Sequence, residues 1–145
     1  MKLRPAATAD IPDLAEIAIA AYAGAFAGIL EPAALAARDN AFFRAHFAAR
    51  IARLHVAEID GRIAGFTLVT SGHLDMMFVA PDAQGQGLGA ALLAQAEAAG
   101  TRSLECFRDN MAARAFYEAK GWRLIRAYER DFIGRSRAFV FYEKP

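Results

Sequence analysis

The chain has 145 residues, of which 56% are hydrophobic and 23% are charged, and its formal net charge is +1. This length and composition are typical of one globular domain with a substantial core, and they exclude a disordered chain. The near-neutral charge gives no electrostatic reason to expect a nucleic acid or an anionic membrane as a partner.

Cysteine content and hydropathy bear on location. Cys106 is the single cysteine, so an internal disulfide is excluded and a reducing compartment is favoured. No apolar run approaches the length of a transmembrane helix, and residues 1–5 lack an apolar signal segment. We therefore expect one cytoplasmic domain, residues 1–145; the sequence does not decide between a monomer and a homodimer. No residue spacing suggests a metal site.

The first third of the chain predicts a short strand followed by helices. Residues 2–4 are a candidate strand, and a polar cap near Asp10 with Pro12 in the first turn begins a helix. Apolar residues then recur at helical spacing. A second helical region is expected from about 32 to 53, with a break near Asp39-Asn40.

The rest of the chain alternates between strands and helices. Asp60-Gly61 is a preferred two-residue hairpin turn, Asp109 or Asn110 can cap a helix, and Gly121 sits where a helix ends. Strands are predicted at 54–59, 62–70, 73–79, 101–107, 122–132 and 137–143, and helices at 88–99 and 110–120. The predicted order is β-α-α-β-β-β-α-β-α-β-β.

A glycine-rich stretch lies between one predicted strand and the helix that begins near Leu88. Its three glycines alternate with other residues, so backbone N–H groups can converge without obstruction by Cβ atoms. A loop of this kind at a helix N-terminus favours anions through its amides and the helix dipole. The sequence predicts a phosphate-bearing ligand held by Gln84, Gly85, Gln86, Gly87, Leu88, Gly89 and Ala90.

Two well-known phosphate loops fit this stretch poorly. A Walker A loop needs Gly-Lys-Ser/Thr at its end, but Ala90 follows Gly89. The dinucleotide fingerprint matches formally at Gly85, Gly87 and Ala90, and Glu105 follows at a suitable distance. That fingerprint requires a tight turn from strand to helix, whereas Pro81 and further residues intervene here, and the chain is short for a second nucleotide-binding half.

A third phosphate-binding family fits better. Gln84-x-x-Gly87-x-Gly89, preceded by Met77-Phe78-Val79-x-Pro81, resembles the acetyl-CoA motif of the GNAT superfamily of N-acetyltransferases. Downstream, Asn110-x-x-Ala113-x-x-Phe116-Tyr117-x-x-x-Gly121-Trp122 resembles the second motif of that family. The resemblance covers nearly the whole chain. It implies an α/β (α+β) fold with a mixed, twisted central sheet flanked by helices.

The resemblance also implies site residues. The main chain of Met77 and Val79, with Phe78 between them, would pair with the pantetheine arm of acetyl-CoA, and the amides of residues 84–90 would hold its pyrophosphate. Asn110 and Tyr117 would share one face of a helix beside the cofactor, and Tyr117 would act as a hydrogen-bonding acid toward the leaving thiolate. The acceptor pocket would be walled by Tyr22, Phe26 and Phe43, which would otherwise be core aromatics.

The base is less determined by the sequence. An alkyl amine with a pKa of about 10.4 is almost fully protonated at pH 7, so a lysine-like acceptor needs a proton acceptor. His73, Asp75, Met77 and Val79 are expected to alternate onto one strand face. His73 and Asp75 are the candidates for the base, and solvated or ion-paired roles remain open for both.

Two function classes follow. The first is an acetyl-CoA-dependent N-acetyltransferase that moves an acetyl group to a primary amine by direct transfer in a ternary complex. The acceptor, a small molecule or a peptide, is not identified by the sequence. The alternative is a non-catalytic acyl-CoA-binding or sensor domain of the same fold. The retention of Asn110 and Tyr117 favours the enzyme.

Overall fold

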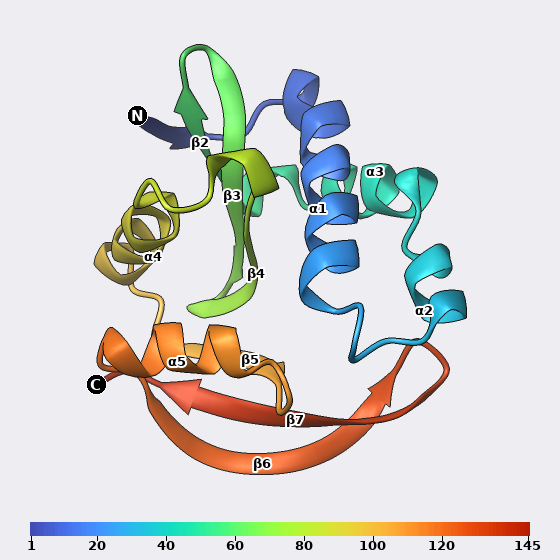
Figure 1. Ribbon diagram of the computed structural model, residues 1–145. Coiled ribbons are helices and arrows are strands. Elements are labelled where there is room, and N and C mark those ends of the chain that lie inside the picture. Colours follow the sequence, from blue (N-terminus) through green and yellow to red (C-terminus); the bar gives the residue numbers. More distant parts are fainter.

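The computed structural model describes residues 1–145 and contains a seven-stranded sheet in the order β1-β2-β3-β4-β5-β7-β6 (Figure 1). The strands are β1 (Lys2–Pro5), β2 (Leu54–Ile59), β3 (Arg62–Thr70), β4 (His73–Val79), β5 (Ser103–Phe107), β6 (Arg123–Phe132) and β7 (Arg135–Glu143). The helices are α1 (Ile11–Ala25), α2 (Pro32–Ala37), α3 (Asn40–Ala48), α4 (Leu88–Ala98) and α5 (Met111–Ala119). The mixed α/β fold and the element order predicted from the sequence are confirmed. The second helical region is divided into α2 and α3.

The break between α2 and α3 has a local cause. Arg38 leaves the helical region of backbone space with φ −90° and ψ 64°. The carboxylate of Asp39 then accepts the N–H of Phe42 at 2.8 Å and caps α3. An acidic N-cap that satisfies a free amide starts a new helix, so the interruption expected near Asp39-Asn40 is present.

The centre of the sheet opens between β4 and β5. These two strands are parallel but pair only at His73 with Ser103 and Leu74 with Leu104. On its other side β4 stays paired with β3 as far as Val79. The last residues of β4 therefore present backbone that no strand pairs on the β5 side, which creates a cleft in the middle of the sheet.

A β-bulge lies inside β4. Val69 pairs with Leu74 and Leu68 pairs with Met76, so Asp75 is the extra residue. A bulge of this kind shifts the alternation of side chains by one position. The expectation that His73, Asp75, Met77 and Val79 share one face is wrong for this reason. Leu74 and Met77, three residues apart, both pack against the cluster that contains Tyr117.

The core consists of two clusters. The larger one joins α1, α3 and part of α4 to the sheet through residues such as Leu14, Phe47 and Leu92. The smaller one lies beneath α4 and α5 and includes Leu93 and Trp122. In Figure 1, α1 and α3 flank β3 and β4 on one side and α4 flanks them on the other. None of the helices combines the length and the apolar character needed to cross a bilayer.

Candidate active site

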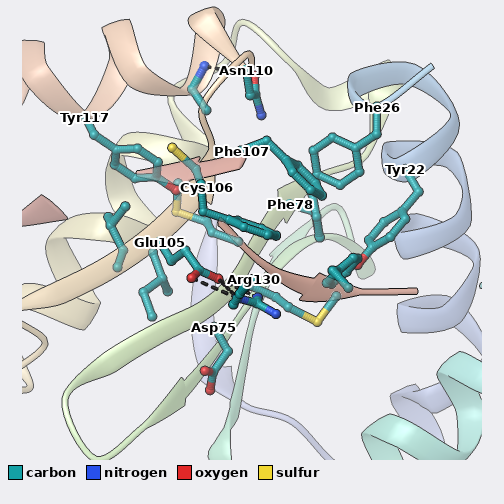
Figure 2. A pocket seen from close by; sticks show the side chains of 17 residues that line it. Tyr22, Phe26, Asp75, Phe78, Glu105, Cys106, Phe107, Asn110, Tyr117 and Arg130 are labelled. Carbon is teal, nitrogen blue, oxygen red and sulfur yellow. Dashed lines mark hydrogen bonds and ion pairs between the residues drawn. The ribbon is translucent and has the colours of Figure 1, made fainter. Parts of the chain in front are cut away.

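The opening between β4 and β5 forms the first of two connected clefts, with a volume of about 140 Å³. Its walls come from α1, β4, β5, α5 and the last two strands (Figure 2). Six residues predicted from the sequence line it: Tyr22, Phe26, Asp75, Met77, Phe78 and Asn110. Tyr117 lines it as well. These seven residues are fewer than half of the 17 that line the cleft, and they come from three separate parts of the chain.

Tyr117 reaches this cleft from the middle of α5. Its ring is packed near Trp122 and Tyr142, and the residue is only 8% exposed. Burial raises the pKa of the Tyr117 hydroxyl, and the nearby Cys106 raises it further. No hydrogen bond contributes to that shift. The group therefore stays protonated and is a hydrogen-bond donor toward the cleft.

Asn110 has a structural role beside any role in binding. Its Oδ1 accepts the backbone N–H of Ala113 at 3.3 Å, so Asn110 is the N-cap of α5. The Asn-x-x-Ala part of the motif has the spacing of an N-cap and the third residue of its helix. Gly121, with φ +91°, follows the helix at its other end, as expected. The motif thus fixes both ends of the helix that carries Tyr117.

The glycine loop lies beyond the far end of β4, between Val79 and α4. Gly85 and Gly87 both have φ +81°, a left-handed conformation that favours glycine. None of the backbone N–H groups from Gln84 to Ala90 donates to a backbone carbonyl, and the first that does is Ala91, to Gly87 at 3.1 Å. A run of free amides at a helix N-terminus is an anion-binding arrangement.

The loop residues themselves line neither of the two clefts. Val79 connects the regions because its side chain lies on the α4 side, where a Cβ on Gly89 would be 3.9 Å from Val79 Cγ2. The predicted cofactor residues therefore occupy two adjoining regions. One is the cleft of Tyr117, Asn110, Met77 and Phe78, and the other is the amide loop of residues 84–90.

A second cleft adjoins the first at the opposite end of β4, with a volume of about 400 Å³. Tyr22, Asp75 and Glu105 are among the residues common to both clefts. Two predicted residues, Phe43 and His73, line only the second. Phe43 is 1% exposed and is therefore mainly a core residue, whereas Phe26 lines only the first cleft.

The two candidates for the base lie in different surroundings. Asp75 is exposed, lines both clefts and accepts a hydrogen bond from Thr70 Oγ1 at 2.5 Å. In Figure 2 its carboxylate points away from the Tyr117 end of the first cleft. His73 has Nδ1 2.8 Å from Ser103 Oγ and is stacked on Phe141. Because Asp75 is the bulged residue of β4, Asp75 and His73 have different neighbours on the acceptor side.

Charged residues outside the two matched GNAT motifs also line the clefts. Glu105 is held by Arg130, with Nη2 2.5 Å from Oε1, and by the hydroxyl of Tyr128. Desolvation raises the pKa of Glu105, but these hydrogen bonds outweigh it and lower the pKa overall, so the carboxylate stays ionised.

Burial raises the pKa of the Cys106 thiol to about 11, so it is not an activated nucleophile. No group of three His, Cys, Asp or Glu residues is arranged to hold a metal ion.

The second cleft is also lined by arginines that no motif had singled out. Arg38 follows α2, Arg50 follows α3, and Arg53 precedes β2. They have no common spacing, and only the packing of α2 and α3 against the sheet brings them to one place. No local pattern in the sequence identifies such a group.

Known proteins resemble this chain in sequence and in fold. A sequence model of the acetyltransferase (GNAT) domain matches residues 20–136. The peptidyl-lysine N-acetyltransferase YjaB of Salmonella typhimurium is 33% identical over 72 residues, which are 49% of this chain and 50% of that protein. The chain spans about half the length of the curated relatives it matches.

Solved structures agree with this match over nearly the full length. The solution structure of apo YjaB from Escherichia coli has a TM-score of 0.82 at 20% identity, with 98% of this chain and 95% of that chain covered. The PaiA N-acetyltransferase of Thermoplasma acidophilum in complex with coenzyme A has a TM-score of 0.78 at 17% identity, with 99% and 98% covered. The structures show the same fold, and the sequence model covers most of the chain. This chain belongs to the GNAT acetyltransferase family.

Proposed function

We propose that residues 1–145 are one N-acetyltransferase domain, which uses acetyl-CoA to acetylate a primary amine by direct transfer in a ternary complex. The observation that carries the proposal is the run of free amides from Gln84 to Ala90. It lies at one end of β4, and the cleft lined by Tyr117 opens along the same strand. An anion site that adjoins a cleft of this kind suits a long cofactor with a phosphate part and a reactive thioester part.

The residues present fit acetyl-CoA in two respects. The amides of residues 84–90 would hold the pyrophosphate, because glycines there leave room for the ligand and the helix dipole favours negative charge. The main chain of Met77 and Val79 would bind the pantetheine arm, since this part of β4 has no strand partner on the β5 side. Asn110, with its Oδ1 engaged in the helix cap, would offer its amide nitrogen to the cofactor.

Acetyl-CoA supplies an acetyl thioester. The neutral amine attacks its carbonyl carbon, the C–N bond forms and the C–S bond breaks. The amine loses one proton and the departing sulfur gains one, so the products are the acetamide and the free thiol. The protein has to assist at two points, the proton that the amine loses and the negative charge that develops on sulfur.

Tyr117 is the group that we assign to the sulfur. A CoA thiol has a pKa of about 8.5, below that of an ordinary phenol at about 10, and burial raises the pKa of Tyr117 further. Complete transfer of its proton to a thiolate is therefore unfavourable. A hydrogen bond that strengthens as charge grows on sulfur stabilises the transition state without such a transfer.

Asp75 is the group that we assign to the amine, with His73 as the other candidate. Asp75 lines both clefts and so can approach an amine that enters from the second and reacts in the first. His73 lines the second cleft only, which suits a contact with the body of the acceptor. The acceptor walls would be Tyr22, Phe26 and Phe43.

We also propose that the domain acts in the cytoplasm, as a monomer or a homodimer, without a nucleic-acid or membrane partner. The net charge of +1 supports the absence of a nucleic-acid or membrane partner, and the single cysteine supports a reducing compartment. The names of the matched relatives contain a peptidyl-lysine acceptor, so a peptide and a small amine are the two acceptor classes to compare.

The proposal is tested by thermal shift with acetyl-CoA, CoA, NAD and ATP, followed by a panel of amines read by release of free thiol. We expect both CoA species to stabilise the fold, by about 2.7 kcal/mol at 100 times the dissociation constant. Stabilisation by NAD without a response to CoA would contradict the assignment. CoA binding without turnover of any amine would favour a non-catalytic acyl-CoA-binding domain.

A further inference from the structure

The second cleft has a local excess of positive charge, although the net charge of the whole chain is only +1. Four arginines and two carboxylates line it, namely Arg38, Arg50, Arg53, Arg130, Asp75 and Glu105. One arginine is neutralised directly, because Arg130 forms a multidentate ion pair with Glu105. Arg53 and Asp75 are linked through the hydroxyl of Thr70. Two guanidinium groups, those of Arg38 and Arg50, remain.

Neither of these two arginines has a carboxylate partner. Arg38 lies over the ring of Phe42, with Cζ 4.0 Å from the ring centroid, and Arg50 donates to the backbone carbonyl of His46 at 3.1 Å. None of the ion pairs in the protein includes either residue. Both are half-buried, so part of their hydration is lost without compensation by a protein anion. Such cations suit an anionic ligand.

The positive charges of Arg38 and Arg50 both act on His46. Its ring is stacked on Phe42, and burial lowers its pKa, with Arg50 and Arg38 lowering it further. A neutral imidazole adds a hydrogen-bonding group to this end of the cleft without changing its charge. The end formed by Arg38, His46 and Arg50, the cationic end, is therefore polar and positively charged.

The phosphates of CoA are not suitable occupants of the cationic end. The amide loop follows Val79, whereas the second cleft is lined by His73 at the start of the same strand. With a rise of about 3.3 Å per residue, the ends of β4 are separated by roughly 20 Å. The cationic end thus lies on the acceptor side of the reacting centre.

We propose that the acceptor is a small zwitterionic amine, an amino acid with a free carboxylate, whose carboxylate binds between Arg38 and Arg50. Its amine then lies toward Asp75 and Glu105, where the two clefts join. A volume of about 400 Å³ is in the range of small-molecule sites. Apolar side chains such as Phe42, Leu68 and Phe132 line the same cleft and suit an apolar amino acid. A lysine-containing peptide without a nearby anion is disfavoured by the two arginines.

This inference rests on the proposed function, and matched acceptors separate the two. Leucine, methionine and phenylalanine are compared with their carboxamides and with a capped lysine peptide, by release of free thiol. We expect kcat/KM, expressed per neutral amine because an amino acid amide is less basic than the free amino acid, to be at least 10-fold higher for each amino acid than for its amide. Equal values per neutral amine, or higher values for the amides or the peptide, would overturn the inference while leaving the acetyltransferase assignment intact.

Variants show whether the two arginines cause the preference. Arg38→Gln and Arg50→Gln should each reduce the preference for the carboxylate by about 10-fold. Arg44→Gln is the matched control, because Arg44 is exposed on α3 and does not line the cleft. An unchanged preference in both cleft variants would remove these arginines from recognition.

A binding measurement does not depend on turnover. N-acetyl-L-phenylalanine and N-acetyl-L-phenylalaninamide are titrated calorimetrically into the protein saturated with CoA. We expect the carboxylate to bind at least 10-fold more tightly, and Arg38→Gln to abolish the difference while Arg44→Gln retains it. Equal affinities in the wild-type protein would overturn the inference even if no amine were turned over.

Discussion

Thr70 Oγ1 donates a hydrogen bond to Asp75 Oδ2 at 2.5 Å, across the turn that joins β3 to β4. The bulge makes this contact possible, because Asp75 has no partner of its own in the β3–β4 ladder. Arg53 donates to the same Thr70 hydroxyl at 3.2 Å. The hydrogen bond from Thr70 thus orients the Asp75 carboxylate away from Tyr117, and Asp75 lines both clefts. This placement distinguishes Asp75 from His73.

The two candidates for the base should give different kinetic effects. We expect Asp75→Asn to lower kcat/KM by about 10²–10⁴-fold and to flatten the acidic limb of the pH–rate profile. His73→Gln should mainly raise KM and leave the pH profile in place, because His73 lines the acceptor cleft only. The measurement is kcat and KM against pH, with an acceptor amine of low pKa expected to restore part of the Asp75→Asn rate.

Asp60→Asn is the control for this experiment. Asp60 lies in the exposed turn between β2 and β3 with φ 51°, where asparagine is equally suitable. Its variant should retain the wild-type profile. A flattened acidic limb in His73→Gln, with Asp75→Asn unaffected, would transfer the role of base to the histidine.

The cofactor loop is tested best at Gly89. This glycine does not have a positive φ, and an added Cβ would meet Phe116 at 3.7 Å and Val79 at 3.9 Å, which are ordinary contacts. We expect Gly89→Val to weaken CoA binding by at least about 10-fold by crowding the amides, with the unliganded melting temperature little changed. Isothermal titration and thermal melting measure both quantities.

Gly87 is less suitable for this test because its φ of +81° strains any larger residue. The matched control is Gly24→Val, since Gly24 is a helical glycine of α1 with open space around it. Wild-type CoA affinity in Gly89→Val would show that the phosphates bind elsewhere.

The parts of the site that depend on local residue spacing could be predicted from the sequence. The loop from Gln84 to Ala90 and the helix from Asn110 to Gly121 are continuous segments, so their glycines, cap and tyrosine can be read directly. The order of the elements follows in the same way from periodicity and turn residues. These features correspond to the cofactor side of the cleft.

The charged part of the acceptor side was not accessible to such reasoning, although Tyr22 and Phe43, which the resemblance implied, do line the second cleft. The bulge at Asp75 depends on how β4 pairs with β3, and a strict alternation of side chains gave the wrong face. Arg38, Arg50 and Arg53 come from three separate segments and are brought together only by tertiary packing. A net charge of +1 conceals a local excess of this kind.

The ion pair between Glu31 and Arg137 predicts a pH-dependent stability. Arg137 donates to both carboxylate oxygens at 2.7 and 2.8 Å, its side chain is 7% exposed, and the pair ties α2 to β7. The hydrogen bonds from Arg137 lower the pKa of Glu31 to about 2. Because the folded-state pKa is depressed from 4.5, the stabilisation is complete above about pH 4.5 and is lost as the pH falls toward 2.

Glu31→Gln should therefore lower the melting temperature by several degrees at pH 7, and the difference from wild type should shrink near pH 2. Glu143→Gln, at an exposed position on β7, is the control and should leave the melting temperature unchanged. A loss of the same size at both pH values would assign the effect to packing and not to charge.

We expect the Tyr117 hydroxyl to act on the leaving sulfur. Tyr117→Phe removes one hydroxyl and leaves the ring against Trp122, so the melting temperature and CoA affinity should barely change. We expect kcat to fall by about 10–1,000-fold, the range for loss of an acid or of a hydrogen bond made in the transition state.

Because burial raises the pKa of Tyr117, no alkaline limb near pH 8–9 should come from this residue. Any such limb should persist in the variant. The control is Tyr142→Phe, whose hydroxyl is bonded to Arg114 and Glu118 and whose residue lines neither cleft. Full activity in Tyr117→Phe, with normal CoA binding, would remove the tyrosine from the mechanism.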